Sequence, residues 1–281
     1  MPHAPGAVAT RRPLRTPRAA RALRTAALLV ATAPVAAACS TPADDGPDPA
    51  RPGAPATASA PSSPTPPPPP PPAVDATVTP LSDRQWNRMV AVGMWRKGCP
   101  VGRKELRRVE MNHWDFNGEL RRGELIVNAD TAPSIVRVFG ELFEQRFPIR
   151  RMESVEAYEG DLDASLKADN TSAFNCRRPD QINAPFMESP HANGRAVDIN
   201  PRENPWQDLR KKAWSPGPEF SARTPGKGKI LEGGPVWRAF TAEGWIWQNI
   251  SVADYMHFDT GYPSVPFRPK AGKTTPGPGG G

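Results

Sequence analysis

The sequence has few histidines, few cysteines and no long hydrophobic run. Its 281 residues include only 4 histidines and 3 cysteines. The apolar stretch at residues 26–38 is interrupted by Pro34. A helix that crosses a membrane needs about 20 apolar residues. This stretch is therefore too short to span a bilayer.

Residues 1–38 also lack any acidic side chain, and they are typical of an export signal. Arginines precede the apolar stretch, and small residues end it just before Cys39. Small residues allow ordinary signal-peptidase cleavage, while a cysteine at that point can be lipidated in a bacterium. Ala36 stands where lipoprotein signals usually have leucine. We expect an extracytoplasmic protein, either secreted or anchored to the outer face of the cell membrane through a lipid on Cys39.

The excess of positive charge belongs to this leader. The formal net charge is +7, and the leader's arginines contribute +6, which leaves 30 basic against 29 acidic side chains in the rest. A nearly neutral mature chain gives no reason to expect a nucleic-acid partner. It suits a small polar substrate or a binding role equally well.

Proline is abundant but unevenly spread along the chain. Residues 39–80 are rich in proline, include an unbroken run at residues 66–72, and have almost no large apolar side chain. Such a segment cannot form a core and is predicted to be a linker. Residues 81–269 hold all 8 tryptophans and are long enough for one domain. Residues 270–281 are rich in proline and glycine and are predicted to be disordered.

The pattern of this domain predicts an α+β fold, with helices packed on a mainly antiparallel sheet. Ser82 and Asp83 can cap a helix that reaches about residue 96, and Asp130 can cap a second one. The second helix has apolar residues at helical spacing. Three strands are expected, at residues 106–116, 119–127 and 149–158, and an Asn-Gly pair between the first two is a strong hairpin signal.

Two stretches combine histidine with carboxylates. In the first, SPHANGRAVDIN, His191 precedes Asp198 by seven residues, so a straight strand would place the two on opposite faces. Gly194 can bend the chain and bring both side chains towards one point. In the second, DYMHFD, the alternation of a strand places His257 on the same side as Asp259.

Two imidazoles and one carboxylate form a ligand set that suits zinc and leaves a fourth position open for water. Zinc lowers the pKa of that water towards 7. A carboxylate that is not a ligand must then take the proton, and Asp254, three residues before His257, is suitably placed.

Each of these residues also has a simpler interpretation. A histidine in an apolar strand is often a hydrogen-bonded core residue, Asp198 can cap a turn, and Asp254 can be a surface acid. His113, beside Trp114, is interpreted as structural. The two stretches together favour the zinc site more than either does alone.

The motifs H-x-x-G-x-A-x-D and, some sixty residues later, D-x-x-H-F resemble those of a known family. They are similar to the VanY-type zinc D,D-carboxypeptidases, D,D-dipeptidases and L-alanyl-D-glutamate endopeptidases, which cut peptidoglycan stem peptides, and most of all to an exported actinobacterial branch. The resemblance covers roughly residues 86–258. Its most specific parts are residues 168–177 and 189–205. It implies a single zinc site and hydrolysis of an amide bond in peptidoglycan peptides.

The resemblance also implies roles for individual residues. His191, Asp198 and His257 match the zinc ligands, and Asp254 matches the general base. Arg177 matches an arginine that stabilises the oxyanion, although by itself it would be interpreted as a solvated surface charge, and Ser189 matches a serine that contacts substrate. The family's Gly-Gly before the last motif is missing from residues 244–251, which puts substrate specificity in doubt.

The cysteines allow more than one interpretation. If Cys39 is removed or lipidated, Cys99 and Cys176 remain, an even number in an oxidising compartment, and we expect a disulfide. Two separate buried thiols are the alternative. The expected function is zinc-dependent cleavage of peptidoglycan peptides, by a carboxypeptidase or an endopeptidase. The alternatives are a peptidoglycan-binding module without activity on the same fold and a secreted hydrolase of an unrelated substrate.

Overall fold

The computed structural model of the protein describes residues 70–177 and 189–270. Residues 67–281 form one unit, and the description concerns this unit alone. The predicted export signal, the lipidation site at Cys39, residues 39–69 of the predicted linker and nearly all of the predicted tail lie outside the described residues. The linker was predicted to reach residue 80, but Thr77–Pro80 form a strand, so the folded part begins before residue 81. Among the residues described, no helix is both long and apolar enough to cross a membrane.

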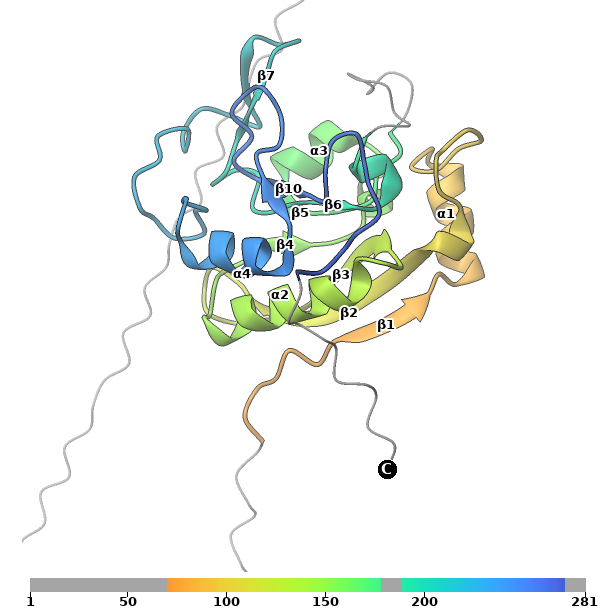
Figure 1. The fold of residues 1–281 in the computed structure, drawn as a ribbon, viewed down its shortest axis with the longest axis horizontal. Coiled ribbons are helices and arrows are strands. Elements are labelled where there is room, and N and C mark those ends of the chain that lie inside the picture. Colours follow the sequence, from red (N-terminus) through yellow and green to blue (C-terminus); the bar gives the residue numbers. More distant parts are fainter. Residues whose placement is uncertain (1–69, 178–188, 271–281) are drawn as a thin grey trace, which may run out of the picture. The chain divides into compact units, whose positions relative to one another are not determined.

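A three-stranded antiparallel sheet forms one side of the fold (Figure 1). Strands β2 (Leu106–Trp114) and β3 (Leu120–Asn128) form the predicted hairpin, and β1 (Thr77–Pro80) pairs with the outer edge of β2. The Asp115 carboxylate accepts hydrogen bonds from the backbone N–H groups of Asn117 and Glu119 and so closes the turn. At the turn, β2 therefore ends two residues before its predicted end and β3 begins one residue after its predicted start, whereas β3 runs one residue beyond its predicted end.

The two predicted helices are present with different ends. Helix α1 (Asp83–Ala91) begins after the expected cap, Ser82, but ends before residue 96 because Gly93 has a φ of +74°, which leaves the helical region. Helix α2 (Ala132–Glu144) buries the predicted apolar face. Its cap was predicted wrongly, because Thr131 precedes the helix and Asp130 instead pairs with Arg195.

The strand predicted at residues 149–158 is mostly absent. Only β4 (Arg151–Met152) forms, and a 3-10 helix at Val155–Tyr158 follows it. The Asn170 side chain accepts from the N–H and donates to the carbonyl of Glu153, so these backbone groups bond a side chain instead of a strand. Strand β5 (Asn170–Thr171) pairs in parallel with β4, and helix α3 (Leu162–Lys167) lies between them in sequence.

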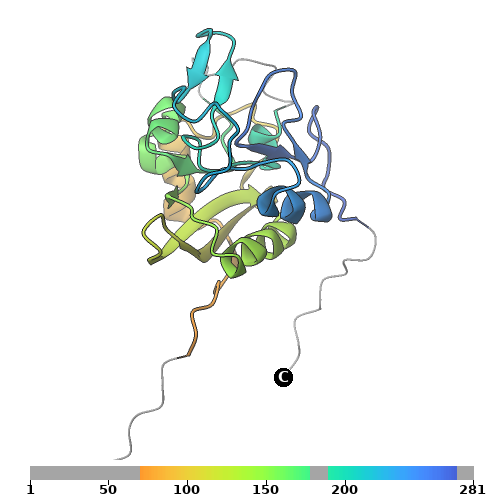
Figure 2. The same ribbon diagram turned by 90° about the vertical axis from the view of Figure 1, so that its left-hand side faces the viewer.

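A second sheet carries the histidine motifs. Its order is β6 (Ala196–Asp198), β10 (His257–Asp259) and β9 (Ile246–Trp247), with antiparallel pairing throughout. Strands β7 (Trp206–Asp208) and β8 (Ala213–Ser215) form a separate hairpin, which stands at the top of Figure 2.

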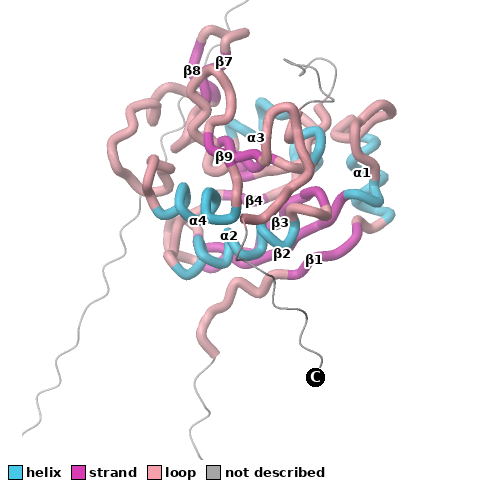
Figure 3. The backbone as a smooth tube through the Cα atoms, in the orientation of Figure 1, coloured by secondary structure: helices cyan, strands magenta, loops and turns pink. Residues whose placement is uncertain are grey.

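Two hydrophobic clusters hold the sheets together. Helix α4 (Pro235–Glu243) runs beside α2 (Figure 3), and both helices enclose the larger cluster with the inner faces of β2, β3, β6 and β10. The smaller cluster lies around α1, Ile126 and Phe174. Helices on mainly antiparallel sheets confirm the predicted α+β class.

Candidate metal centre and active site

His191 is positioned by a short turn that ends in a required glycine. A 3-10 helix spans His191–Asn193, and Gly194 ends it with a φ of +68°. A Cβ at residue 194 would lie 2.6 Å from the backbone nitrogen of Asn128, so a larger residue does not fit there. The predicted bend is therefore present, and it turns the chain between His191 and β6.

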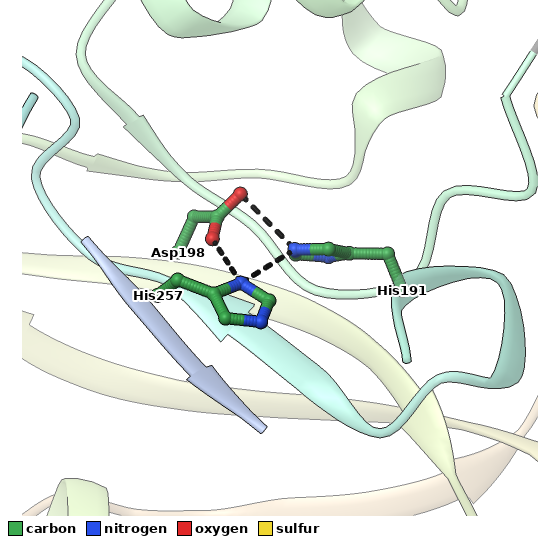
Figure 4. A group of neighbouring side chains, drawn as sticks. All are labelled: His191, Asp198 and His257. Carbon is green, nitrogen blue, oxygen red and sulfur yellow. Dashed lines mark hydrogen bonds and ion pairs between the residues drawn. The ribbon is translucent and has the colours of Figure 1, made fainter. Parts of the chain in front are cut away.

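Asp198 and His257 meet because their strands pair. They are direct partners in the antiparallel ladder between β6 and β10. His257 Nδ1 lies 3.1 Å from Asp198 Oδ1, and His191 Nε2 lies 3.2 Å from Asp198 Oδ2. The two ring nitrogens are 3.1 Å apart (Figure 4). All three side chains are buried, and within the described ranges they are the one group of at least three His, Cys, Asp or Glu side chains that can hold a metal ion.

The outer nitrogens of the two rings already have partners. His191 Nδ1 lies 2.7 Å from the Ala173 carbonyl oxygen, and His257 Nε2 lies 3.1 Å from Asp259 Oδ2. If each outer nitrogen donates its proton to these acceptors, the inner nitrogens carry lone pairs. Two lone pairs and a carboxylate then face one another, an arrangement that a cation satisfies. The donor set therefore fits a metal ion.

The electrostatics of this cluster are those of a negatively charged site. Burial by itself would raise the pKa of Asp198, but the neighbouring His191 and His257 lower it strongly. Burial by itself would lower the pKa of His257, but Asp198 and Asp259 raise it well above its usual value. The first shift keeps Asp198 ionised, and the second shows that the carboxylates around His257 favour a positive charge there.

Arg177 is held beside the cluster by an unusual backbone conformation. Its φ is +63°, in the left-handed region that few side chains other than glycine adopt. Asn175 Oδ1 accepts from its N–H at 2.8 Å, and Arg96 Nε donates to its carbonyl at 3.1 Å. Burial lowers the pKa of Arg177, whereas the charges of Asp198 and Asp254 raise it.

Cys99 and Cys176 form the predicted disulfide directly before this arginine. Cys176 is completely buried in the smaller hydrophobic cluster. The bridge therefore ties the residue that precedes Arg177 to the segment after α1.

Asp254 lies near the cluster without belonging to it. Its Oδ1 is buried and has no hydrogen-bond partner in the described part of the chain. Burial raises its pKa above the usual carboxyl range, while the charge of His257 lowers it and that of Asp198 raises it. A carboxylate with a raised pKa and an unused oxygen is suited to accepting a proton.

A cavity of about 710 Å³ joins these groups. His191, Asp198 and His257 line it, and so do Arg177, Ser189 and Asp254. The six residues to which the family resemblance assigns a role at the metal or in the reaction thus border one space.

His113 lies elsewhere, on β2, and does not line the cavity. It is buried, its Nδ1 lies 3.4 Å from the Trp114 carbonyl, and burial lowers its pKa. These surroundings agree with the structural interpretation of His113.

Residues 183–260 match a family model described as D-alanyl-D-alanine carboxypeptidase. This segment is therefore similar to that family. The matched part includes β6, β10, all three metal-ligand candidates and Asp254, whereas Arg177 and both disulfide cysteines precede it. No curated protein and no solved structure matches the chain. The family match supports a peptidase of the VanY type related to peptidoglycan.

The structure adds supporting groups to this site that the sequence analysis did not assign. Asp259 hydrogen-bonds the outer nitrogen of His257, and its other oxygen accepts from the Asn249 side chain and the Gly261 N–H. Asp259 lies two residues after His257 on the same face of the strand, and this spacing could have indicated its role. The Ala173 carbonyl, which accepts from His191 Nδ1, could not be predicted from the sequence, because every residue has a backbone carbonyl.

Proposed function

We propose that this chain is an exported zinc peptidase that hydrolyses an amide bond in peptidoglycan stem peptides. The observation that carries the proposal is the convergence of His191 Nε2, His257 Nδ1 and Asp198 on one point, with the outer ring nitrogens held by other groups. Two nitrogens and a carboxylate are a ligand set typical of catalytic zinc. The family match supports the same reaction class.

His191, Asp198 and His257 would hold the zinc. Zinc bound there supplies Lewis-acid activation of the scissile carbonyl and of water. The remaining steps belong to side chains of the cavity.

Asp254 accepts the proton of the attacking water. Its Oδ1 is buried and makes no hydrogen bond to the described residues, so the oxygen is available for that proton. The same carboxyl can then return the proton to the leaving amine. The reaction therefore needs no second titratable group.

Arg177 stabilises the negative charge that develops on the carbonyl oxygen. A fixed cation in a partly buried site acts in this way without reorganising during the reaction. The left-handed backbone at Arg177 and the preceding disulfide support a fixed position. Ser189 borders the same cavity and is proposed to contact the substrate.

The test is digestion of purified muropeptides by the zinc-loaded mature protein, with products identified by mass. Shortened peptides that appear with zinc and disappear after chelation are expected. Loss of one terminal residue identifies a carboxypeptidase, and cleavage inside the stem identifies an endopeptidase. Tight binding of muropeptides without cleavage would contradict the proposal and favour a wall-binding module.

The proposed location is outside the cytoplasm, where peptidoglycan lies. The export signal predicted at residues 1–38 and the lipidation predicted at Cys39 support it. Fractionation of cells that produce the full chain, with and without Cys39→Ala, tests both. Retention of the chain in the cytoplasm would contradict export.

A further inference from the structure

One wall of the cavity consists of two paired segments, and it brings an unassigned arginine to the active site. Trp206 at the start of β7 forms an antiparallel bridge with Asp254, and the Gln207 N–H donates to the Ala253 carbonyl at 2.7 Å. Arg210 follows β7 by two residues and lines the cavity. The strand that leads to Arg210 is thus fixed directly to the segment that carries Asp254.

The Arg210 side chain is held in place from one side only. Its Nε and Nη2 donate to the two oxygens of Asp208 at 3.2 and 3.1 Å, and Asp208 is only 1% exposed. Lys211, in the same turn, forms an ion pair with Asp163 on α3, with 2.7 Å between Lys211 Nζ and Asp163 Oδ2. Arg210 Nη1 has no hydrogen bond to any described residue, and the side chain is 40% exposed. A positioned guanidinium therefore presents free N–H groups.

The cavity is lined by carboxylates at Asp198, Asp208 and Asp254 and also by two guanidinium groups. Arg177 lines the same cavity, and the charge of Arg210 helps to lower the pKa of Arg177. Two guanidinium groups in one cavity repel each other, and an anion between them removes that repulsion. The planar fork of arginine also matches the two oxygens of a carboxylate.

We propose that Arg210 determines specificity by binding a carboxylate of the peptide substrate close to the bond that is cut. The inference rests on the proposed function. Leu209, 61% exposed, and Ile250, 36% exposed, also line the cavity, so the anion site has apolar neighbours that suit the methyl group of alanine. The carboxylate can be a C-terminus or the free carboxyl of an acidic residue.

The experiment uses two pairs of synthetic peptides. One pair ends in D-Ala-D-Ala with a free carboxyl or a carboxamide, and the other contains an L-Ala–D-Glu bond with the glutamate carboxyl free or amidated. Binding to the zinc-loaded mature protein is measured by calorimetry, and cleavage is followed by mass. The variants are Arg210→Gln and Arg210→Lys. Lys212→Gln, which removes a charge from the same turn outside the cavity lining, is the matched control.

In the protein with Arg210, the acid of one pair should bind about tenfold more tightly than its amide, as expected for a half-exposed charged hydrogen bond. Arg210→Gln should remove this preference, Arg210→Lys should restore part of it, and Lys212→Gln should leave it intact. The effect should lie mainly in KM, because Arg210 is placed for binding. The pair that shows the preference identifies the source of the carboxylate.

Equal binding of acid and amide in both pairs would overturn the inference about Arg210, whatever is cleaved. The same holds if Arg210→Gln keeps the preference while its thermal unfolding is unchanged. An Arg210-dependent preference without cleavage of any peptide would support the inference and contradict the proposed peptidase function instead.

Discussion

His257 and Asp198 are direct cross-strand partners, and their facing side-chain atoms lie 3.1 Å apart. Residues opposite each other in an antiparallel pair have Cβ atoms about 5 Å apart, so their side chains can hold one ion between them. The ladder between β6 and β10 thus fixes two of the three proposed ligands by backbone hydrogen bonds. Only His191 arrives from a separate turn.

Replacement of either histidine should remove bound zinc. His191→Ala and His257→Ala each leave two of the three proposed ligands, and metal analysis should no longer find one zinc per chain. His113→Gln is the control, because His113 is the other histidine among the described residues and lies away from the cavity. Full zinc content in both alanine variants would contradict the ligand assignment.

Asp259 should influence zinc affinity without touching the metal. Asp259→Asn leaves the three ligands in place but weakens the hydrogen bond that orients His257. Changes at such supporting partners reduce metal affinity by about 10- to 100-fold. Competition with a zinc chelator measures the effect. An affinity equal to that of the unmodified protein would show that the Asp259 hydrogen bond plays no part in metal binding.

The sequence predicted which residues line the cavity, but it did not predict which contacts position their side chains. The spacing of His191, Gly194 and Asp198 implies a bend, and the structure contains it. Alternation along the last strand places His257 beside Asp259, but spacing cannot say which group accepts its hydrogen bond. That depends on tertiary contacts, as does the Ala173 carbonyl that holds His191.

In the fold, too, the sequence predicted what depends on local pattern and not what depends on tertiary contacts. The hairpin and the buried face of α2 follow from local pattern, and both are present. The strand predicted at residues 149–158 fails because the Asn170 side chain occupies the backbone groups of Glu153. Arg210 showed no signal in sequence, because its position depends on the pairing of β7 with the segment that carries Asp254.

Gly194→Ala should destabilise the protein and disturb the metal site. The φ of +68° and the 2.6 Å approach to the Asn128 nitrogen both oppose a side chain, so we expect a loss of more than about 1 kcal/mol in unfolding free energy. Gly140→Ala in α2 is the matched control, since a Cβ there meets nothing within 4 Å. The control should raise stability by about 0.5–1 kcal/mol. Denaturant unfolding measures the stability of both variants. If Gly194→Ala were as stable as Gly140→Ala, the requirement for glycine at 194 would be contradicted.

Loss of the disulfide should lower stability while zinc remains bound. The bridge spans a sequence separation of 77 residues, for which the chain-entropy model gives about 4 kcal/mol. Cys99→Ala with Cys176→Ala should lose about that amount in denaturant unfolding. Activity should fall as well, because Cys176 precedes Arg177. Mass mapping that finds both thiols free in the exported protein would refute the pairing in solution.

Asp254→Asn tests most directly whether Asp254 accepts a proton while three other residues hold the metal. Asparagine keeps the size of the side chain but cannot act as the base. Zinc content and muropeptide turnover are measured on the same preparation. We expect full zinc content and a rate about 10²–10⁴-fold lower, the usual range for a general base. Loss of zinc would make Asp254 a ligand, and unchanged turnover would contradict the mechanism.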